Sequence, residues 1–93
     1  MRHFILVKFK DRTDRERLIS EAEALFRPML DWPEVASVRL IPGNSERPNR
    51  YDWMIEMTMS PAGLERFDAS DIHRDWKATY SDRFEAKTIF DCD

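Results

Sequence analysis

The segment that most constrains what this chain can fold into is Arg2–Phe9, RHFILVKF. Successive side chains of a strand point to opposite faces, and both alternating sets in this segment are largely apolar. A strand that is apolar on both faces belongs in the middle of a sheet that is covered above and below. The sequence therefore predicts a layered fold built around this strand.

Turn residues and hydrophobic periodicity divide the rest of the chain into three further strands and two helical regions. The expected elements are strands at 2–9, 35–41, 51–59 and 84–90, a helix from about 13 to 27, and helical residues from 61 to 80. Thr13, Ser60 and Ser70 are the expected helix caps, and the strands at 2–9 and 51–59 are the expected central neighbours. Their order, β-α-β-β-α-β, is that of the split βαβ arrangement. We therefore predict an α+β, ferredoxin-like fold with a four-stranded antiparallel sheet. With no repeat or internal boundary, residues 1–93 form a single domain.

Composition limits the partners and the compartment. The net charge of −3 comes without a clustered basic patch, so no nucleic-acid partner is expected. Cys92 is the single cysteine, which fits a reducing cytoplasm. The longest apolar run, Phe4–Val7, is too short for a bilayer span or a signal-peptide core. We expect a cytoplasmic protein without a membrane anchor.

The chain contains few residues of the types that commonly bind metals or phosphates. His3, His73 and Cys92 are the only soft metal ligands, and their spacing matches no zinc motif. Two glycines, Gly43 and Gly63, do not make a glycine-rich phosphate loop. The sequence therefore predicts neither a metal site nor a cofactor.

One copy of the chain has too little helix to cover both faces of the sheet. If both helices cover one face, the other face is left open, and we assign seven apolar residues to it: Ile5, Val7, Phe9, Trp53, Ile55, Met57 and Met59. Burying each large apolar side chain is worth about 1.5–3 kcal/mol, and monomers rarely expose such a patch. We therefore predict a homodimer, packed sheet on sheet, that encloses a partly filled barrel.

Four motifs in order suggest a family. They are the opening His3–Lys10, the start of a strand at Tyr51-Asp52, the run His73-Arg74-Asp75-Trp76, and the closing Ile89-Phe90-Asp91. Together they resemble the stress-responsive A/B barrel family, also called Dabb, of the dimeric α+β barrel superfamily, whose members start with a sequence similar to RHxVLFKFK. The resemblance covers essentially the whole chain.

The resemblance implies a homodimeric barrel with a cleft between sheet and helices, in which some members bind apolar or aromatic small molecules. One plant member is a polyketide cyclase, in which a helix histidine acts as general base with a tyrosine a few residues upstream. That histidine falls on His73 here. The tyrosine position falls on Phe67, which has no hydroxyl, and the first two residues of the family's HPAH-like pattern fall on Ser70 and Asp71.

These observations give a candidate site centred on His73, whose imidazole is suited to removing a proton from an acidic carbon of a bound carbonyl compound. In this hypothesis Tyr51 or Tyr80 polarises the carbonyl, and His3 and Trp53 position the ring. The residues expected to line the site are His3, Ile5, Val7, Trp53, Ile55, Phe67 and Trp76. The alternative for His73 is a structural histidine bonded to a backbone carbonyl or a carboxylate.

Three functions remain open. The first is a homodimer that binds a small apolar or aromatic carbonyl compound, with cofactor-free, cyclase-like or lyase-like acid–base activity at His73. The second is a non-catalytic, stress-associated dimeric binding protein with a side-chain-filled barrel, which the lost hydroxyl at Phe67 favours. The third is a cofactor-independent monooxygenase, which only the related α+β barrels suggest.

Overall fold

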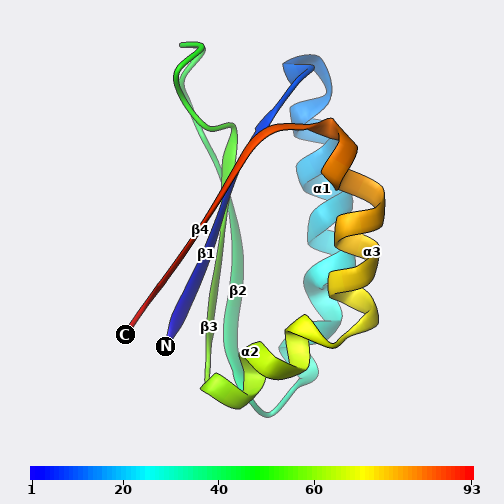
Figure 1. The fold of residues 1–93 in the computed structure, drawn as a ribbon, viewed down its shortest axis with the longest axis vertical. Coiled ribbons are helices and arrows are strands. Elements are labelled where there is room, and N and C mark those ends of the chain that lie inside the picture. The colour runs from blue at the N-terminus through cyan, green and yellow to red at the C-terminus, as the bar shows by residue number, and fades with distance from the viewer.

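The computed structural model describes all of residues 1–93 and has the predicted order of elements (Figure 1). The strands are β1 (Arg2–Phe9), β2 (Val35–Pro42), β3 (Trp53–Met59) and β4 (Phe84–Cys92). The helices are α1 (Arg15–Phe26), α2 (Pro61–Asp68) and α3 (Asp71–Tyr80), with short 3₁₀ turns at Arg12–Asp14, Arg27–Asp31 and Ser81–Arg83. The sheet is antiparallel in the order β2-β3-β1-β4. The predicted α+β, ferredoxin-like fold class is confirmed.

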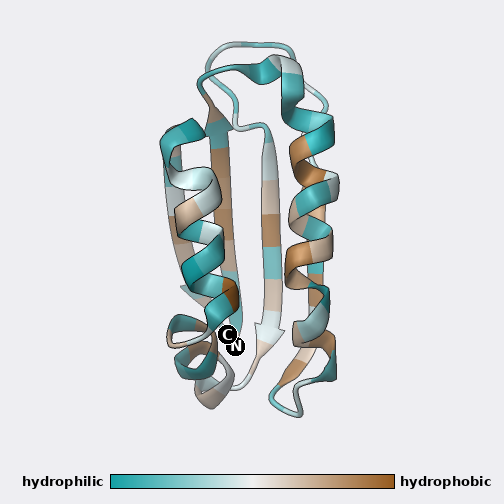
Figure 2. Cartoon of the chain, turned by 90° about the vertical axis from the view of Figure 1, so that its right-hand side faces the viewer, coloured by the Kyte–Doolittle hydropathy of each residue, from teal (hydrophilic) through white to brown (hydrophobic).

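The two strands predicted to be central, β1 and β3, are neighbours in the middle of the sheet. Their register places His3 opposite Met57, Ile5 opposite Ile55 and Val7 opposite Trp53, so these side chains share one face. Helices α1 and α3 lie side by side over that face (Figure 2).

None of the three α-helices has the length and the apolar composition that a membrane-spanning helix requires.

The assignment of the sheet's two faces from the sequence is wrong. The seven residues given to the open face lie under the helices, each at most 3% exposed, and form the core. The face without helices instead carries five large apolar side chains: Phe4, Leu6, Ile41, Met54 and Phe90. Because both faces of the central strands are apolar, alternation alone does not say which one the helices cover. The rings of Phe9 and Trp53 are buried on the helix-covered face, with their centroids 5.4 Å apart.

The helix starts follow local sequence signals in two of three cases. As predicted, Ser60 and Ser70 cap α2 and α3, with their hydroxyls accepting hydrogen bonds from the backbone N–H groups of Gly63 and His73. α1 begins differently from expectation. A 3₁₀ turn precedes it, and the Asp11 carboxylate accepts a hydrogen bond from the N–H of Thr13, at 3.0 Å.

Candidate functional site around His3 and His73

The space between the sheet and the helices is filled by aromatic side chains. The ring centroid of Phe26 lies 6.1 Å from that of Phe67 and 5.2 Å from that of Trp76, and Trp53 lies 5.8 Å from Trp76. All four residues are at most 2% exposed. The predicted lining residues Ile5, Val7, Trp53, Ile55, Phe67 and Trp76 therefore form the hydrophobic core.

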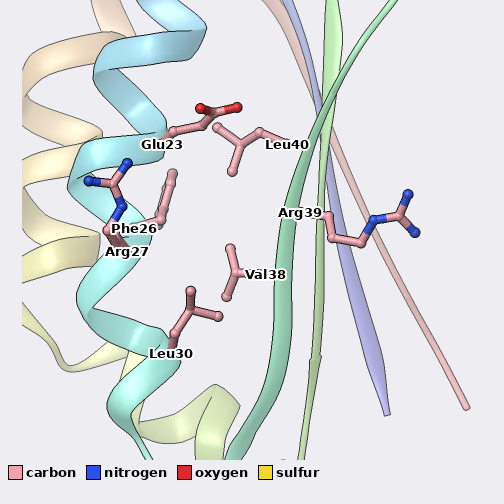
Figure 3. Close-up of a pocket in the computed structure, with 7 residues that line it drawn as sticks. All are labelled: Glu23, Phe26, Arg27, Leu30, Val38, Arg39 and Leu40. Atoms are coloured by element: carbon pink, nitrogen blue, oxygen red, sulfur yellow. The ribbon is translucent and has the colours of Figure 1, made fainter.

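A hollow of about 350 Å³ lies between the end of α1 and the edge strand β2. Phe26, Leu30, Val38 and Leu40 turn their side chains toward it, whereas Arg39 points away to the other face of the sheet (Figure 3). None of the site residues predicted from the sequence lines this hollow.

The three residues predicted to act together are far apart. Tyr51 precedes β3, so strand alternation does not extend to it, and its hydroxyl lies 2.5 Å from that of Thr88 on the helix-free side. Tyr80 is buried at the far end of α3, about 10 Å along the helix from His73. The structure therefore does not assemble His73, Tyr51 and Tyr80 into one site.

The structure does give His3 a carboxylate partner. Asp91 stands opposite His3 in the β1–β4 ladder, and its Oδ1 lies 2.5 Å from the Nδ1 of His3. His3 is 5% exposed, and the edge of its ring meets Phe67 at a centroid distance of 6.1 Å. Because a carboxylate only accepts, Nδ1 carries the proton, and Nε2 of the neutral imidazole keeps its lone pair. Sequence reasoning missed Asp91, since the pairing spans 88 positions.

His73 packs against the same phenyl ring. Its ring centroid is 4.8 Å from that of Phe67, and its Nδ1 donates to the backbone carbonyl of Asp68 at 3.1 Å. This is the carbonyl bond that the structural alternative for His73 predicts. The bond also leaves Nε2 of the neutral ring as an acceptor. Phe67 thus contacts two imidazoles, each held through Nδ1.

Tyr80 provides a prediction for alkaline pH. Burial, and secondarily the carboxylate of Glu21, raise the pKa of Tyr80 above its usual value of about 10. Between that value and its pKa in the folded protein, the unfolded chain loses this proton first, so the free energy of unfolding falls as pH rises. The contribution of Tyr80 is complete below about pH 10. We expect Tyr80→Phe to flatten this decline in urea unfolding measured at alkaline pH. Tyr51→Phe is the control, and an unchanged slope in Tyr80→Phe contradicts the prediction.

Comparison with solved structures defines the fold family. No protein-family model and no curated protein sequence matches the chain. A Dabb family protein with a ferredoxin-like fold from Mesorhizobium loti superposes with a TM-score of 0.77, at 14% identity, over 99% of this chain and 93% of that chain. The chain has the fold of a Dabb protein. The resemblance predicted from the sequence is thus confirmed in the fold.

Two further structures share this Dabb fold. A dimeric ferredoxin-like protein of unknown function from Jannaschia sp. has a TM-score of 0.80 at 15% identity, over 99% of this chain and 96% of that chain. The hydroxynitrile lyase from Passiflora edulis has a TM-score of 0.72 at 14% identity, over 96% of this chain and 87% of that chain. At these identities the likeness establishes the fold.

Proposed function

We propose that this chain is a homodimeric Dabb protein that binds a small apolar or aromatic carbonyl compound, with His3 as general base. The observation that carries this proposal is the His3–Asp91 pair, in which the carboxylate holds Nδ1 and leaves Nε2 available. The only buried side-chain polar atom without a hydrogen-bond partner belongs to another residue, so Nε2 of His3 is not sealed from solvent. In this proposal the pair takes the role of general base that was predicted for His73.

The chemistry follows from the His3–Asp91 pair. Nε2 of His3 removes a proton from the carbon next to the carbonyl group, and the Asp91 carboxylate stabilises the imidazolium that forms. The imidazolium then returns this proton to the oxygen of the enolate or to a carbon of the product, which regenerates the neutral base. A positioned acid or base of this kind contributes about 10²–10⁴-fold to a rate.

The open margin of the helical layer offers a place for the ligand. Because aromatic rings fill the interior, we place the ligand over β4, outside the cleft that the sequence predicted. Ile89 lies on the same face as His3 and Asp91, opposite Ile5, yet it is 52% exposed. Its side chain would contact the apolar body of the ligand while the carbonyl group meets His3.

The helix-free face supports the homodimer. Its apolar side chains are partly exposed or, for Phe90, 59% exposed, and nothing in the chain covers them. Burial against a second sheet would remove this surface from water and would form the barrel between the two copies. The Jannaschia protein of the same fold is described as dimeric, which fits this arrangement.

Replacing the proposed base tests the chemistry. Substrates would be a set of aryl alkyl ketones and arylacetaldehydes, which carry a hydrogen on the carbon next to the carbonyl group. We expect His3→Gln to lower kcat by about 10²-fold or more while the melting temperature stays close to that of the unaltered protein. Asp91→Asn should lower kcat less, and Asp93→Asn, which removes a nearby carboxylate without a partner, is the control. Equal turnover by His3→Gln and the unaltered protein would contradict the role of His3.

A second candidate is the non-catalytic binding dimer. The ring packing around Phe26, Phe67 and Trp76 favours it, because this packing leaves no room in the interior for a substrate. A protein of this kind would be stabilised by one of the carbonyl compounds in a thermal-shift screen without converting it. That outcome would select this candidate over the enzyme.

A further inference from the structure

The hollow between the end of α1 and the edge strand β2 is separate from the site around His3. β2 and β4 form opposite edges of the sheet, and His3 is paired with Asp91 of β4. On its inner side the hollow is closed by Phe26, whose ring packs against those of Phe67 and Trp76. A ligand in the hollow therefore does not reach the His3–Asp91 pair.

The walls of the hollow are apolar and come from two sides. Phe26 belongs to α1 and Leu30 to the 3₁₀ turn that follows it, and both face Val38 and Leu40 of β2 (Figure 3). Val38 and Leu40 are half-buried, whereas Leu30 is 52% exposed. The volume of about 350 Å³ falls within the range of about 300–1,000 Å³ that small-molecule sites have.

Leu30 is the exposed apolar side chain for which the proposed function provides no partner. The large apolar residues that are exposed are Leu30, Tyr51, Ile89 and Phe90. The Tyr51 hydroxyl is paired with that of Thr88, Ile89 would contact the proposed carbonyl ligand, and Phe90 would lie in the proposed dimer interface. Leu30 is on the helix-covered side of the sheet, so a sheet-to-sheet dimer leaves it and the hollow open (Figure 3).

One charged side chain faces the hollow without a partner. Glu23 extends its carboxylate across the hollow toward Leu40 (Figure 3). Arg27 and Arg39 also line the hollow, but their guanidinium groups point away from its apolar side chains (Figure 3). None of the ion pairs that α1 makes includes Glu23. The hollow is therefore an apolar surface with an unpaired carboxylate at its rim.

The position of Glu23 in α1 adds to this negative charge. Glu23 lies in the last turn of α1, which contains no basic residue, and Arg27 follows at the C-cap without pairing with it. The C-terminal end of a helix carries a partial charge of about −0.5, so a carboxylate is unfavourable there and a cation is favourable. A cation beside Glu23 would meet both the carboxylate and the negative end of the helix.

We propose that this hollow binds a small amphipathic amine, whose ammonium group pairs with the Glu23 carboxylate and whose aryl or branched alkyl group packs against Leu30 and Val38. The apolar part provides most of the contact, and the carboxylate selects the charge of the ligand. An anion of the same shape would face Glu23 and the helix end, and a neutral compound would gain no ion pair from them.

Three probes that share a phenylethyl skeleton test the site. Phenylethylamine is the cation, phenylethanol is neutral, and phenylpropionate is the anion. The methyl resonances of Leu30, Val38 and Leu40 in a ¹H–¹³C spectrum report on the hollow. We expect phenylethylamine to move them in a saturable way, with a roughly millimolar Kd because so small a ligand makes few contacts. It should bind about fivefold more tightly than phenylethanol, which is the upper end for an exposed ion pair, and phenylpropionate should bind most weakly.

The role of the carboxylate is tested with Glu23→Gln, which removes the charge and keeps the size of the side chain. We expect this variant to bind phenylethylamine about fivefold more weakly than the unaltered protein and to bind phenylethanol equally well. High salt should weaken the binding of phenylethylamine to the unaltered protein in the same way. Glu21→Gln, at an exposed glutamate of α1 that does not line the hollow, is the matched control.

Three results would overturn the proposal. They are methyl signals that phenylethylamine does not move, equal affinities for the three probes, and phenylethylamine binding that Glu23→Gln leaves undiminished. Each of these measurements is independent of turnover at His3, so the amine site and the proposed function can fail separately.

Discussion

Replacing Asp52 with alanine is expected to lower the free energy of unfolding by about 3–5 kcal/mol. The substitution removes the acceptor of the Phe9 N–H and leaves the Arg12 guanidinium without its carboxylate, both in a partly or fully buried setting. Breaking a buried pair from one side is costly because the remaining group loses its partner and does not regain full solvation. Urea unfolding followed by circular dichroism measures the loss. In a domain of this size the melting temperature should fall by at least about 12 °C.

The control for this prediction is Glu21→Ala. Glu21 pairs with Arg17 at 2.7 Å on the exposed face of α1, where both side chains are about half exposed. Such an i,i+4 pair is worth about 0.3–0.5 kcal/mol. A loss of stability in Asp52→Ala as small as that in Glu21→Ala would show that the Asp52 cluster does not stabilise the fold.

The elements that the sequence predicted correctly are those coded by local patterns. Arg2–Phe9 is central because its apolar residues fall on both alternating sets, and no edge strand would carry them. Ser60 and Ser70 cap helices because each serine hydroxyl is close enough to accept a hydrogen bond from the backbone N–H three residues later. This short distance along the chain does not depend on the rest of the fold. These interactions lie within a few positions in the sequence.

The parts that could not be predicted depend on partners far apart in the chain. Arg12 and Asp52 are 40 positions apart, and no local pattern links them. His3 and Asp91 were each visible in motifs, but their contact requires the register of β1 against β4. Hydrophobic patterns fix the period of a strand without fixing its register or its neighbour, so both side-chain pairs appeared only in the folded structure.

The same limit explains why the wrong face of the sheet was assigned to the dimer. A second copy was predicted from an uncovered apolar face, and such a face exists on the side opposite to the one expected. Leu6 lies near its centre, on β1, with Met54 of β3 on one side and Thr88 of β4 on the other. The proposal of a homodimer therefore depends on this residue and its neighbours, and Ile5 and Val7 remain buried in each subunit.

Leu6→Asp is expected to dissociate the proposed dimer. A carboxylate at the centre of an apolar interface loses its hydration without gaining a partner, whereas in a separate subunit it faces water. Sedimentation at micromolar concentration should show twice the subunit mass of 11.1 kDa for the unaltered protein and a single, folded subunit for Leu6→Asp. Leu30→Asp, the same change at a 52% exposed leucine next to α1, should remain dimeric. A stable single subunit in the unaltered protein, or a Leu6→Asp variant that stays paired, would remove the sheet-to-sheet dimer and the barrel between its copies.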